Sequence, residues 1–311
     1  MPTTVQEILR LIWNHPANRG HRLGAYARMA LWQAHKRLVG RPFDLKVYDG
    51  MRFRAHPDST QVGRLLYFGG LPDFQAMTFM KRYLRPGDGF IDGGANEGIF
   101  TLLAAELVSD RGEVHAFEAH PVYVKRLREN VERNRLSSVS VHEVAVGENP
   151  GTLPFVLRGT GSRIRTAEDA GEVVSAQVVR LDETLPDRTW AMGKLDIEGA
   201  EHSALRGAEK LLSRAEPPVW FLELVDPFLA RFGSSVHEVS RWLGDHGYDL
   251  MHYEPWLNRF VPGPGAGAPD VFAVSRERLA EVNNRLRASH ERAGGHSLIR
   301  SGPREAREVA R

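Results

Sequence analysis

The sequence predicts an α/β protein with a mostly parallel sheet and helices on both of its faces. Two observations favour this class. From residue 90 onwards, short apolar runs alternate with longer stretches of helical periodicity, which is the pattern of consecutive strand–helix units. In the first unit, a strand leads into a turn with three glycines and then into a helix. Backbone and helix N–H groups can therefore approach a ligand closely at this turn.

The composition is that of an ordinary globular protein, with 42% hydrophobic and 26% charged residues in a chain of 311. The absence of cysteine excludes disulfides, thiolate metal sites and cysteine nucleophiles. No apolar run reaches the ~20 residues that a membrane span needs, and the N-terminus lacks the apolar core of a signal peptide. These features lead us to expect a cytoplasmic protein.

The N-terminal segment is predicted to begin with two amphipathic helices, over residues 4–14 and 20–38. We expect the second helix to pack on the domain through one broad apolar stripe, formed by Leu23, Tyr26, Met29, Ala30 and Trp32. A period-two alternation around Asp49-Gly50 then predicts a β-hairpin of residues 43–48 and 51–55. A glycine-rich loop over 67–73 and a helix over about 73–84 follow.

The two ends of the chain are basic. Residues 1–41 contain seven Lys and Arg against Glu7 alone, and residues 276–311 contain nine Arg against five Glu. Because the whole chain carries a net charge of only +2, the middle must be acidic. This asymmetry is typical of contact with a membrane surface or a polyanion. We expect weak membrane-surface contact through the N-terminal helices, the alternative being a solvated helix face and a loose tail.

Seven strands are predicted after residue 85, at 90–92, 114–118, 139–144, 194–197, 219–225, 249–253 and 271–274. The helices between them are expected at about 98–109, 121–135, 201–214 and 235–246.

Two segments depart from this alternation. Residues 152–157 and 173–181 predict an inserted β-hairpin arm around a polar loop at 158–171. The last two strands are joined by 255–269, which is rich in Pro and Gly, so we expect them to form an antiparallel pair at the sheet's edge. Disorder is expected beyond about residue 290.

The turn at 92–98 was compared with three ligand-binding patterns. A Walker A loop has suitable glycine spacing at Gly93 and Gly98, but Ile99 stands where the lysine must be. A dinucleotide fingerprint requires a second glycine where Ala95 or Asn96 stands. The remaining pattern, Asp-x-Gly-x-Asn-x-Gly, is a variant of loops that hold a nucleoside cofactor.

The second strand ends at Glu118, 26 residues after Asp92. A carboxylate there can accept hydrogen bonds from both ribose hydroxyls and would repel a 2′-phosphate. The alternative is an acidic N-cap for the helix that follows Pro121. Together with the turn, we favour the ribose. The end of the third strand, around Ala145, offers small apolar groups for an adenine, or is a plain core strand.

The fourth strand places Lys194, Asp196 and Glu198 on one side, at the carboxyl end where open α/β sheets bind ligands. Ionisable groups beside buried apolar residues are costly unless they pair or function. We therefore interpret Asp196 and Glu198 as functional. Glu201 is interpreted as an acid in the first turn of the next helix.

The chain resembles the FkbM family of S-adenosylmethionine-dependent methyltransferases over about residues 88–275. The resemblance is carried by the motifs Phe90-Ile-Asp-Gly-Gly-Ala-Asn-Glu-Gly, Ala116-Phe-Glu-Ala, Arg180-Leu-Asp-Glu-Thr-Leu and Lys194-Leu-Asp-Ile-Glu-Gly-Ala-Glu. One departure is that the family's Phe-Glu-Pro reads Phe117-Glu118-Ala119-His120-Pro121 here, with the proline displaced.

The resemblance implies a class I methyltransferase fold, Rossmann-like, with a seven-stranded sheet and an antiparallel last strand. It implies S-adenosylmethionine as cofactor and O-methylation of a hydroxyl on a sugar, glycan or secondary metabolite. The catalytic residues that it implies are Asp196 and Glu198. For the cofactor, the resemblance implies Asp92, Gly94, Asn96 and Gly98 in the methionine-side loop, Glu118 at the ribose and Asp196 beside the methyl group. We predict that Gly93, Ala95, Ala119 and Ala145 also belong to the cofactor site.

Methyl transfer needs mainly an aligned acceptor oxygen and the exclusion of water. Asp196 or Glu198 can take the hydroxyl proton, and His202 is a weaker candidate. A metal-assisted version would use Asp196 and Glu223, but no third oxygen ligand stands out, so no metal is predicted. The segments 159–165 and 67–73 and the N-terminal helices are expected to close over the site.

We divide the chain into an N-terminal helical and hairpin extension (1–85), a methyltransferase domain (86–275) and a basic, partly disordered tail (276–311). The expected partner is a small-molecule or glycan acceptor and not a nucleic acid. Two alternatives stay open from the residues alone. One is an NAD-dependent oxidoreductase, which the glycine spacing disfavours, and the other is a non-catalytic methyltransferase-like binding protein.

Overall fold

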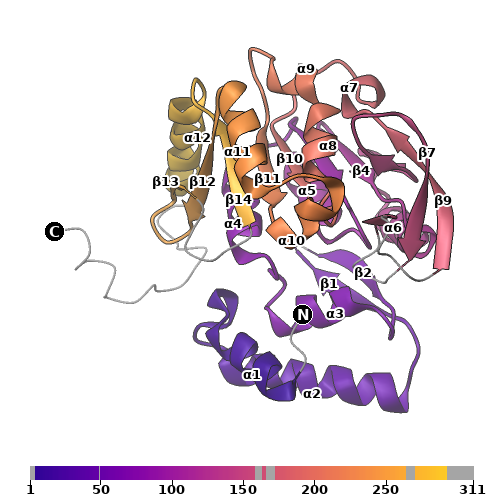
Figure 1. The fold of residues 1–311 in the computed structure, drawn as a ribbon. Helices are drawn as coiled ribbons and strands as arrows, with labels where there is room; N and C mark the ends of the chain where they lie inside the picture. The colour runs from indigo at the N-terminus through magenta and orange to yellow at the C-terminus, as the bar shows by residue number, and fades with distance from the viewer. Residues whose placement is uncertain (1–3, 49, 158–162, 166–171, 264–269, 293–311) are drawn as a thin grey trace.

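The main sheet has eight strands in the order β13-β12-β14-β11-β10-β3-β4-β5 (Figure 1). The computed structural model describes residues 4–48, 50–157, 163–165, 172–263 and 270–292. The strands of this sheet are β3 (Gly89–Gly93), β4 (Glu113–Phe117), β5 (Val139–His142), β10 (Met192–Leu195), β11 (Val219–Glu223), β12 (Tyr248–Glu254), β13 (Arg259–Pro262) and β14 (Asp270–Ser275).

The sheet is parallel from β5 to β11, and β14 is antiparallel to both of its neighbours. The predicted mostly parallel sheet with an antiparallel last strand is therefore confirmed, but within the described residues it has eight strands and not seven, because β13 is added. The expected placement of the last two strands is corrected in part. They do pair, but β14 lies between β11 and β12, and β13 forms the edge. The strand β13 was concealed in the Pro- and Gly-rich linker, and its Pro262 is tolerated because edge strands leave N–H positions unused.

A second sheet of four short strands, in the order β6-β9-β7-β8, forms the inserted arm. Its strands are β6 (Ala145–Val146), β7 (Gly151–Leu157), β8 (Arg163–Ile164) and β9 (Glu172–Val179). The antiparallel pairing of β7 with β9 confirms the predicted hairpin. The predicted third strand of the main sheet ends early, because the chain leaves at His142 and enters the arm at Ala145. Of the polar loop at 158–171, only 163–165 lies within the described residues.

Helices cover both faces of the main sheet, as predicted. Their bounds are α1 (Val5–Asn14), η1 (Pro16–Asn18), α2 (Arg22–Leu38), α3 (Thr60–Tyr67), α4 (Phe74–Tyr83), α5 (Ile99–Val108), α6 (Pro121–Arg133), α7 (Leu181–Thr184), α8 (Glu201–Arg206), α9 (Glu209–Leu212), α10 (Asp226–Leu229), η2 (Ala230–Phe232), α11 (Val236–Asp245) and α12 (Leu279–Arg292).

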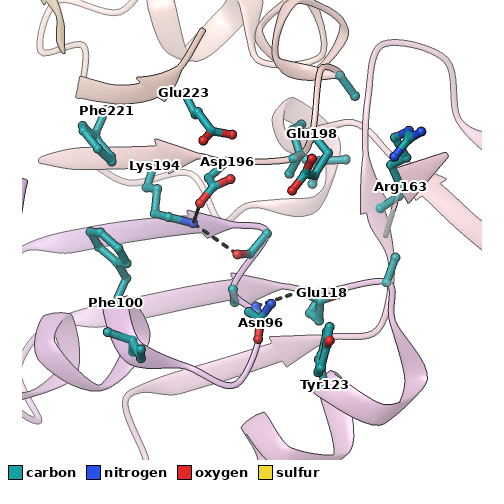
Figure 2. A pocket seen from close by; sticks show the side chains of 18 of the residues that line it. Asn96, Phe100, Glu118, Tyr123, Arg163, Lys194, Asp196, Glu198, Phe221 and Glu223 are labelled. Carbon is teal, nitrogen blue, oxygen red and sulfur yellow. Dashed lines mark hydrogen bonds and ion pairs between the residues drawn. The ribbon is translucent and has the colours of Figure 1, made fainter. Parts of the chain in front are cut away.

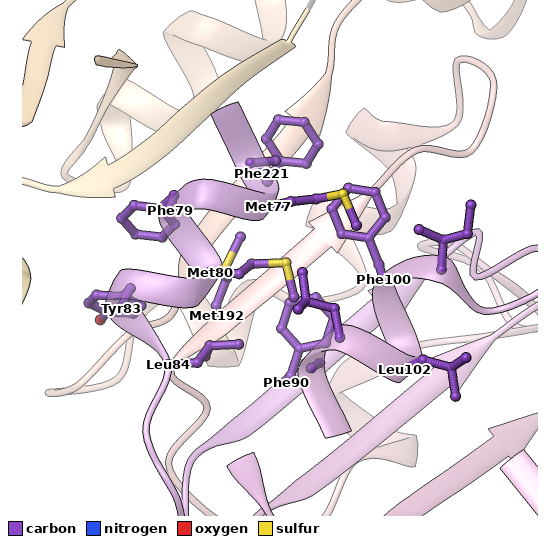
Figure 3. Packing of buried hydrophobic residues seen from close by; sticks show 14 of the residues in the cluster. Met77, Phe79, Met80, Tyr83, Leu84, Phe90, Phe100, Leu102, Met192 and Phe221 are labelled. Carbon is purple, nitrogen blue, oxygen red and sulfur yellow. The ribbon is translucent and has the colours of Figure 1, made fainter. Parts of the chain in front are cut away.

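The alternation of residues along each strand divides the core into two main clusters. On β11, Phe221 packs in the cluster with α3, α4, α5 and α12, whereas Trp220 and Leu222 pack in the cluster with α8, α9 and α11. Figure 3 shows the first cluster, where Met80 of α4 lies beside Phe90 of β3 and Met77 lies beside Phe100 of α5. Each such fully buried side chain contributes about 1.5–3 kcal/mol. The clusters hold the strand ends in fixed positions, which is what a site at those ends requires.

The N-terminal segment forms the layer at the bottom of Figure 1, where α2 lies beside α3. The predicted hairpin is present as β1 (Phe43–Val47) and β2 (Met51–Ala55), although Asp49 of its turn is outside the described residues. The helix α3 was not predicted. It begins at the N-cap Ser59, whose side chain accepts a hydrogen bond from the Val62 N–H at 3.3 Å. Within the described segments, no helix is both long and apolar enough to cross a membrane.

The expected apolar stripe of the second helix is wrong in its composition. Ala25 and Trp32 are buried, but Leu23 is 81% exposed. Leu23 and Trp32 are nine positions apart, so at about 100° per residue they lie on opposite sides of the helix. The helix α2 packs through the Ala25 and Trp32 side.

The C-terminal helix α12 packs on α4, and its Val282 and Leu286 are buried. Arg285 forms an ion pair with Asp88 and donates to the Tyr83 carbonyl at 2.7 Å. Residues 293–311, where disorder was expected, lie outside the described residues. The boundaries at 85 and 275 stay a prediction, but one core cluster includes side chains from α2, β3 and α12.

Candidate active site

A cavity of about 350 Å³ opens at the carboxyl ends of β3, β4, β10 and β11 (Figure 2). It has the size of a small-molecule or cofactor pocket. The predicted site residues that line it are Gly94, Ala95, Asn96, Glu118, Ala119, Ala145, Asp196 and Glu198. Asp92, Gly93 and Gly98 do not line it, and they support the first turn from behind.

The turn after β3 is held against the strand end of β10. Gly94 has a φ of +75°, and a Cβ atom there would overlap the carbonyl oxygen of Asp196. Asn96 also has a left-handed backbone, with a φ of 52°, and its N–H donates to the Glu118 Oε2 at 2.8 Å. The glycine is therefore needed for close packing of two strand ends, and the turn is tied to the end of β4.

Glu118 occupies the wall between β4 and the cavity. Its Oε1 accepts from the His120 N–H at 2.7 Å and its Oε2 from the Asn96 N–H at 2.8 Å. Burial raises its pKa to about 7. The alternative role as a helix cap is wrong, because His120 caps α6 through a bond from the Val122 N–H to Nδ1. Each carboxylate oxygen keeps a free lone pair, so Glu118 can accept two further hydrogen bonds.

A buried lysine lies behind the centre of the site. Lys194 Nζ is 3.3 Å from Asp92 Oδ1 and 3.8 Å from Asp196 Oδ2, and it donates to the Gly94 carbonyl at 3.1 Å. Burial opposes its charge, but Asp92 and Asp196 outweigh burial and raise its pKa. Asp92 is fully buried, and its other oxygen accepts from Thr101 Oγ1 at 2.6 Å. Asp92 thus holds Lys194 and does not reach the cavity.

The turn at 196–199 directs two carboxylates into the cavity. Glu198 adopts a left-handed backbone with a φ of 59°, and Gly199 follows with a φ of +111°. A Cβ atom at Gly199 would overlap the Phe228 carbonyl. Glu201 Oε1 accepts from the Ile197 N–H at 2.9 Å and from the Gly199 N–H at 3.3 Å. Glu201 lies in the first turn of α8, as predicted, and also fixes this turn.

Acidic side chains from four elements meet at this end of the cavity. Burial, together with the charge of Asp196, raises the pKa of Glu198 to about 7 and that of Glu223 to about 9. The pKa of Asp270 rises to about 7 because of burial and the charges of Asp73 and Asp196. Close carboxyl groups cannot all ionise, so several of them hold protons at neutral pH. The cluster therefore contains both hydrogen-bond donors and acceptors.

Sequence reasoning missed several residues of this wall. Arg64 of α3 lines the cavity and pairs at 2.6 Å with Asp73, the N-cap of α4, which also lines the cavity and is the last residue of the segment 67–73 that was expected to cover the site. Asp270 stands opposite Glu223 in the register of β14 with β11. The position of Asp270 at the start of the last strand could have indicated that it lies near the site. Its pairing with Glu223 could not be predicted, because the partner of an antiparallel strand is known only once the strand order is known. No sequence pattern predicted the helix α3 or its place at the cavity.

The arm and α3 cover the cavity. Of these two, only the arm was predicted to do so. Phe155, Arg163 and Ile164 of the arm line the cavity, as do Gln61 and Arg64 of α3. The helices α1 and α2 contribute no lining residue, so the expectation that they close over the site is wrong. The segment 158–162 of the predicted loop is outside the described residues.

His202 is not a candidate base. Its Nδ1 lies 2.7 Å from Ser234 Oγ and its ring packs against Trp242, away from the cavity. Asp196 and Glu223 both line the cavity, as the metal-assisted alternative required. In the part of the chain that the structure describes, no group of three or more His, Cys, Asp or Glu residues is arranged to hold a metal ion.

Comparison with known protein families identifies the chain. A family model described as the methyltransferase FkbM domain matches residues 92–250. The chain belongs to the FkbM family of methyltransferases. It is an S-adenosylmethionine-dependent methyltransferase, and the oxidoreductase alternative is removed.

The chain is also similar to individual proteins. The methyltransferase is 33% identical to the 31-O-demethyl-FK506 methyltransferase FkbM of Streptomyces tacrolimicus, across 54% of this chain and 75% of that protein. It is 40% identical to a ribosomal protein L11 methyltransferase of Thermosipho africanus, across 32% of this chain and 41% of that one. A crystal structure of methyltransferase FkbM from Methylobacillus flagellatus shares 15% identity and a TM-score of 0.42, covering 83% of this chain and 61% of its own.

The residues present fit a nucleoside cofactor. Glu118 has unused acceptor capacity toward the cavity, which suits a pair of ribose hydroxyls. The small apolar side chains Ala119 and Ala145 also line the cavity. The acidic end at Asp196 faces the opposite part of the cavity, where a positively charged group is stabilised.

Proposed function

We propose that this methyltransferase transfers a methyl group from S-adenosylmethionine to a hydroxyl oxygen of a sugar, glycan or secondary metabolite. The observation that carries the proposal is the group of carboxyl side chains, Asp196, Glu198 and Glu223, across the cavity from the Asn96–Glu118 pair. Carboxyl groups that share protons suit an acceptor with several hydroxyls. The name of the Streptomyces tacrolimicus relative supports methylation at oxygen.

The cofactor would be held by the turn after β3 and by the end of β4. Glu118 would accept hydrogen bonds from the ribose hydroxyls, and Ala119 and Ala145 would pack on the base. The Asn96 N–H fixes Glu118 in place at 2.8 Å. When bound, S-adenosylmethionine supplies a methyl group on a sulfonium sulfur, which leaves as a neutral thioether.

Glu198 is the proposed general base. Its pKa of about 7 leaves it partly ionised at neutral pH, which is where a general base is most effective. Glu198 would accept the proton of the acceptor hydroxyl. Asp196 is paired with Lys194 and orients the acceptor. Glu223, with a pKa of about 9, stays protonated and donates a hydrogen bond.

The test is a two-part experiment on the full chain. Calorimetry with S-adenosylhomocysteine should show saturable binding, and absence of binding would overturn the cofactor assignment. Incubation with S-adenosylmethionine and fractionated glycans or polyketide alcohols should give a product heavier by one methylene group. Fragmentation that places the new methyl on nitrogen or carbon would contradict O-methylation without affecting the cofactor assignment.

A further inference from the structure

The most exposed large apolar side chains of the described chain lie on one helix outside the catalytic domain. Leu23, Leu31 and Leu38 of α2 are 81%, 70% and 84% exposed. Soluble surfaces carry scattered apolar residues, but a cluster of exposed leucines indicates an interaction site.

These leucines belong to one continuous stripe. At about 100° per residue, all exposed apolar positions of α2 fall within an arc of about 100°. We define the α2 stripe as Leu23, Ala27, Ala30, Leu31, Ala34 and Leu38. The buried residues Ala25 and Trp32 lie on the opposite side. The helix therefore has two apolar faces, one packed on α3 and one in solvent.

The surroundings of the α2 stripe are basic. Arg37 borders the α2 stripe, and Arg10 and Arg41 are also exposed; none of the three forms an ion pair with another described residue. Lys36 lies on the opposite side of α2, with its Nζ 5.8 Å from the centre of the Trp32 ring. The one acidic residue of this segment, Glu7, is occupied as a cap of α1, accepting from the Thr4 N–H at 3.1 Å. Among the described residues, no carboxylate therefore neutralises these three arginines.

We propose that α1 and α2 dock the methyltransferase on an anionic lipid bilayer, with α2 lying along the interface. An exposed leucine face flanked by basic residues is what interfacial helices present to acyl chains and anionic headgroups. Figure 1 shows these helices as the outermost layer of the molecule, free to lie on a plane.

A second copy of the chain is a weaker occupant of the α2 stripe. A symmetric dimer would place the same surface on both sides of the contact, which brings the cations of two α2 layers together. Like charges across an interface oppose association. An anionic bilayer satisfies both the leucines and the cations.

Docking also has a consequence for substrate access. The helix α2 packs on α3, and Gln61 and Arg64 of α3 line the cavity. The bilayer would therefore lie one helix layer from the cavity wall, so a membrane-borne acceptor would meet the site without leaving the surface.

The experiment is vesicle flotation of the full chain with phosphatidylglycerol-containing vesicles and with pure phosphatidylcholine vesicles. We expect flotation with the anionic vesicles only, and weaker flotation at high salt because salt screens the charges. The double variant Leu31→Glu/Leu38→Glu should lower the vesicle affinity by at least about tenfold. The matched control is Val122→Glu/Leu153→Glu, at exposed apolar positions on α6 and β7, and it should float like the wild type.

Circular dichroism establishes that both double variants are folded. The proposal is overturned if the wild type does not float, if the α2 variant floats as well as the wild type, or if the control loses as much affinity. Light scattering identifies the other occupant. A dimer that Leu31→Glu/Leu38→Glu dissociates, with no vesicle binding, would show that the α2 stripe is an interface between copies.

Discussion

Two residues with a left-handed backbone shape the walls of the cavity. Asn96 and Glu198 have φ values of 52° and 59°, a region that costs a non-glycine residue free energy. Hydrogen bonds stabilise each one: the Asn96 N–H donates to Glu118, and N–H groups of the turn around Glu198 donate to Glu201. The strained backbone places polar groups at the cavity that a relaxed strand end would direct elsewhere.

Glu198→Gln tests the proposed base. The amide keeps the size of the side chain but cannot accept the hydroxyl proton, so kcat should fall by about 10²–10⁴-fold. Binding of S-adenosylhomocysteine should change little. The control is Glu183→Gln, at a side chain that is 60% exposed on α7. Equal kcat values for Glu198→Gln and the control would rule Glu198 out as the base.

The raised pKa of Glu118 leads us to expect that cofactor binding depends on pH. Its pKa of about 7 means that the free protein holds a proton there at lower pH, and the carboxylate form is needed to accept two hydroxyls. Affinity for S-adenosylhomocysteine should therefore fall below pH 7, by up to about tenfold per pH unit. Calorimetry across this range, repeated with Glu118→Gln, checks it. A profile that Glu118→Gln leaves as steep as in the wild type would contradict the assignment.

Glu223 predicts that a substitution stabilises the protein. Its folded pKa of about 9 lies above the ordinary value of 4.5, so its contribution to stability is complete below pH 4.5 and is lost as the pH rises through 9. Glu223→Gln removes this loss of stability, because an amide does not ionise. The variant should melt above the wild type at pH 8–9 by at least about 2 °C, and the two should converge near pH 4.5. Thermal melts of the variant and the wild type at both pH values test this prediction. If the difference in melting temperature does not change with pH, ionisation of Glu223 is not the cause of that difference.

At the scale of elements, the site depends on how one turn is bound to the helix after it. The carboxylate of Glu201 accepts two N–H groups of the turn at 196–199, and that turn carries Asp196 and Glu198. Glu201 is fully buried. Its hydrogen bonds with the two N–H groups are therefore shielded from water. Glu201 is thus a positioning residue.

Glu201→Ala should release that turn. Two N–H groups lose their acceptor, at a cost of about 1–3 kcal/mol each, and kcat should fall more than the affinity for S-adenosylhomocysteine. Glu201→Gln keeps an acceptor oxygen and should restore most of kcat. If the Gln variant is as inactive as the Ala variant, Glu201 acts through its charge and not through these bonds.

Element boundaries show what local patterns can specify. The strands β3, β4 and β10 were predicted because long-range pairing buries them on both faces, which leaves apolar runs. The helix α3 and the strand β13 were missed. α3 has Gly63 in its middle, and β13 lies in a Pro- and Gly-rich linker. Both are stabilised by the core or by one edge, which a local pattern does not report.

The whole molecule is joined by one core cluster that runs from α2 through the main sheet to α12. Trp32, Phe90 and Leu286 all belong to it. Because the ends of the chain pack on the same core as the catalytic strands, we expect unfolding in a single cooperative transition.

Leu286→Ala tests this arrangement. Leu286 is fully buried, so the substitution should lower the free energy of unfolding by about 2–5 kcal/mol. Calorimetry should show one transition shifted downward as a whole. Leu257→Ala, at a side chain that is 47% exposed, serves as control and should melt within about 0.5 kcal/mol of the wild type. A second, unshifted transition would show that α12 unfolds independently.

The sequence by itself determined the fold class, the cofactor turn and the acidic end of β10, because each rests on local spacing of glycine, carboxylate and apolar residues. The tertiary structure decided which residues face the cavity. In the folded chain Asp92 lies behind Lys194, and His202 lies away from the cavity. Arg64, Asp73 and Asp270, from segments far apart in the chain, line the cavity wall. The tertiary structure also showed which face of α2 is packed. Burial and charge pairing depend on neighbours that only the folded chain brings together, and so do the shifted pKa values of the site.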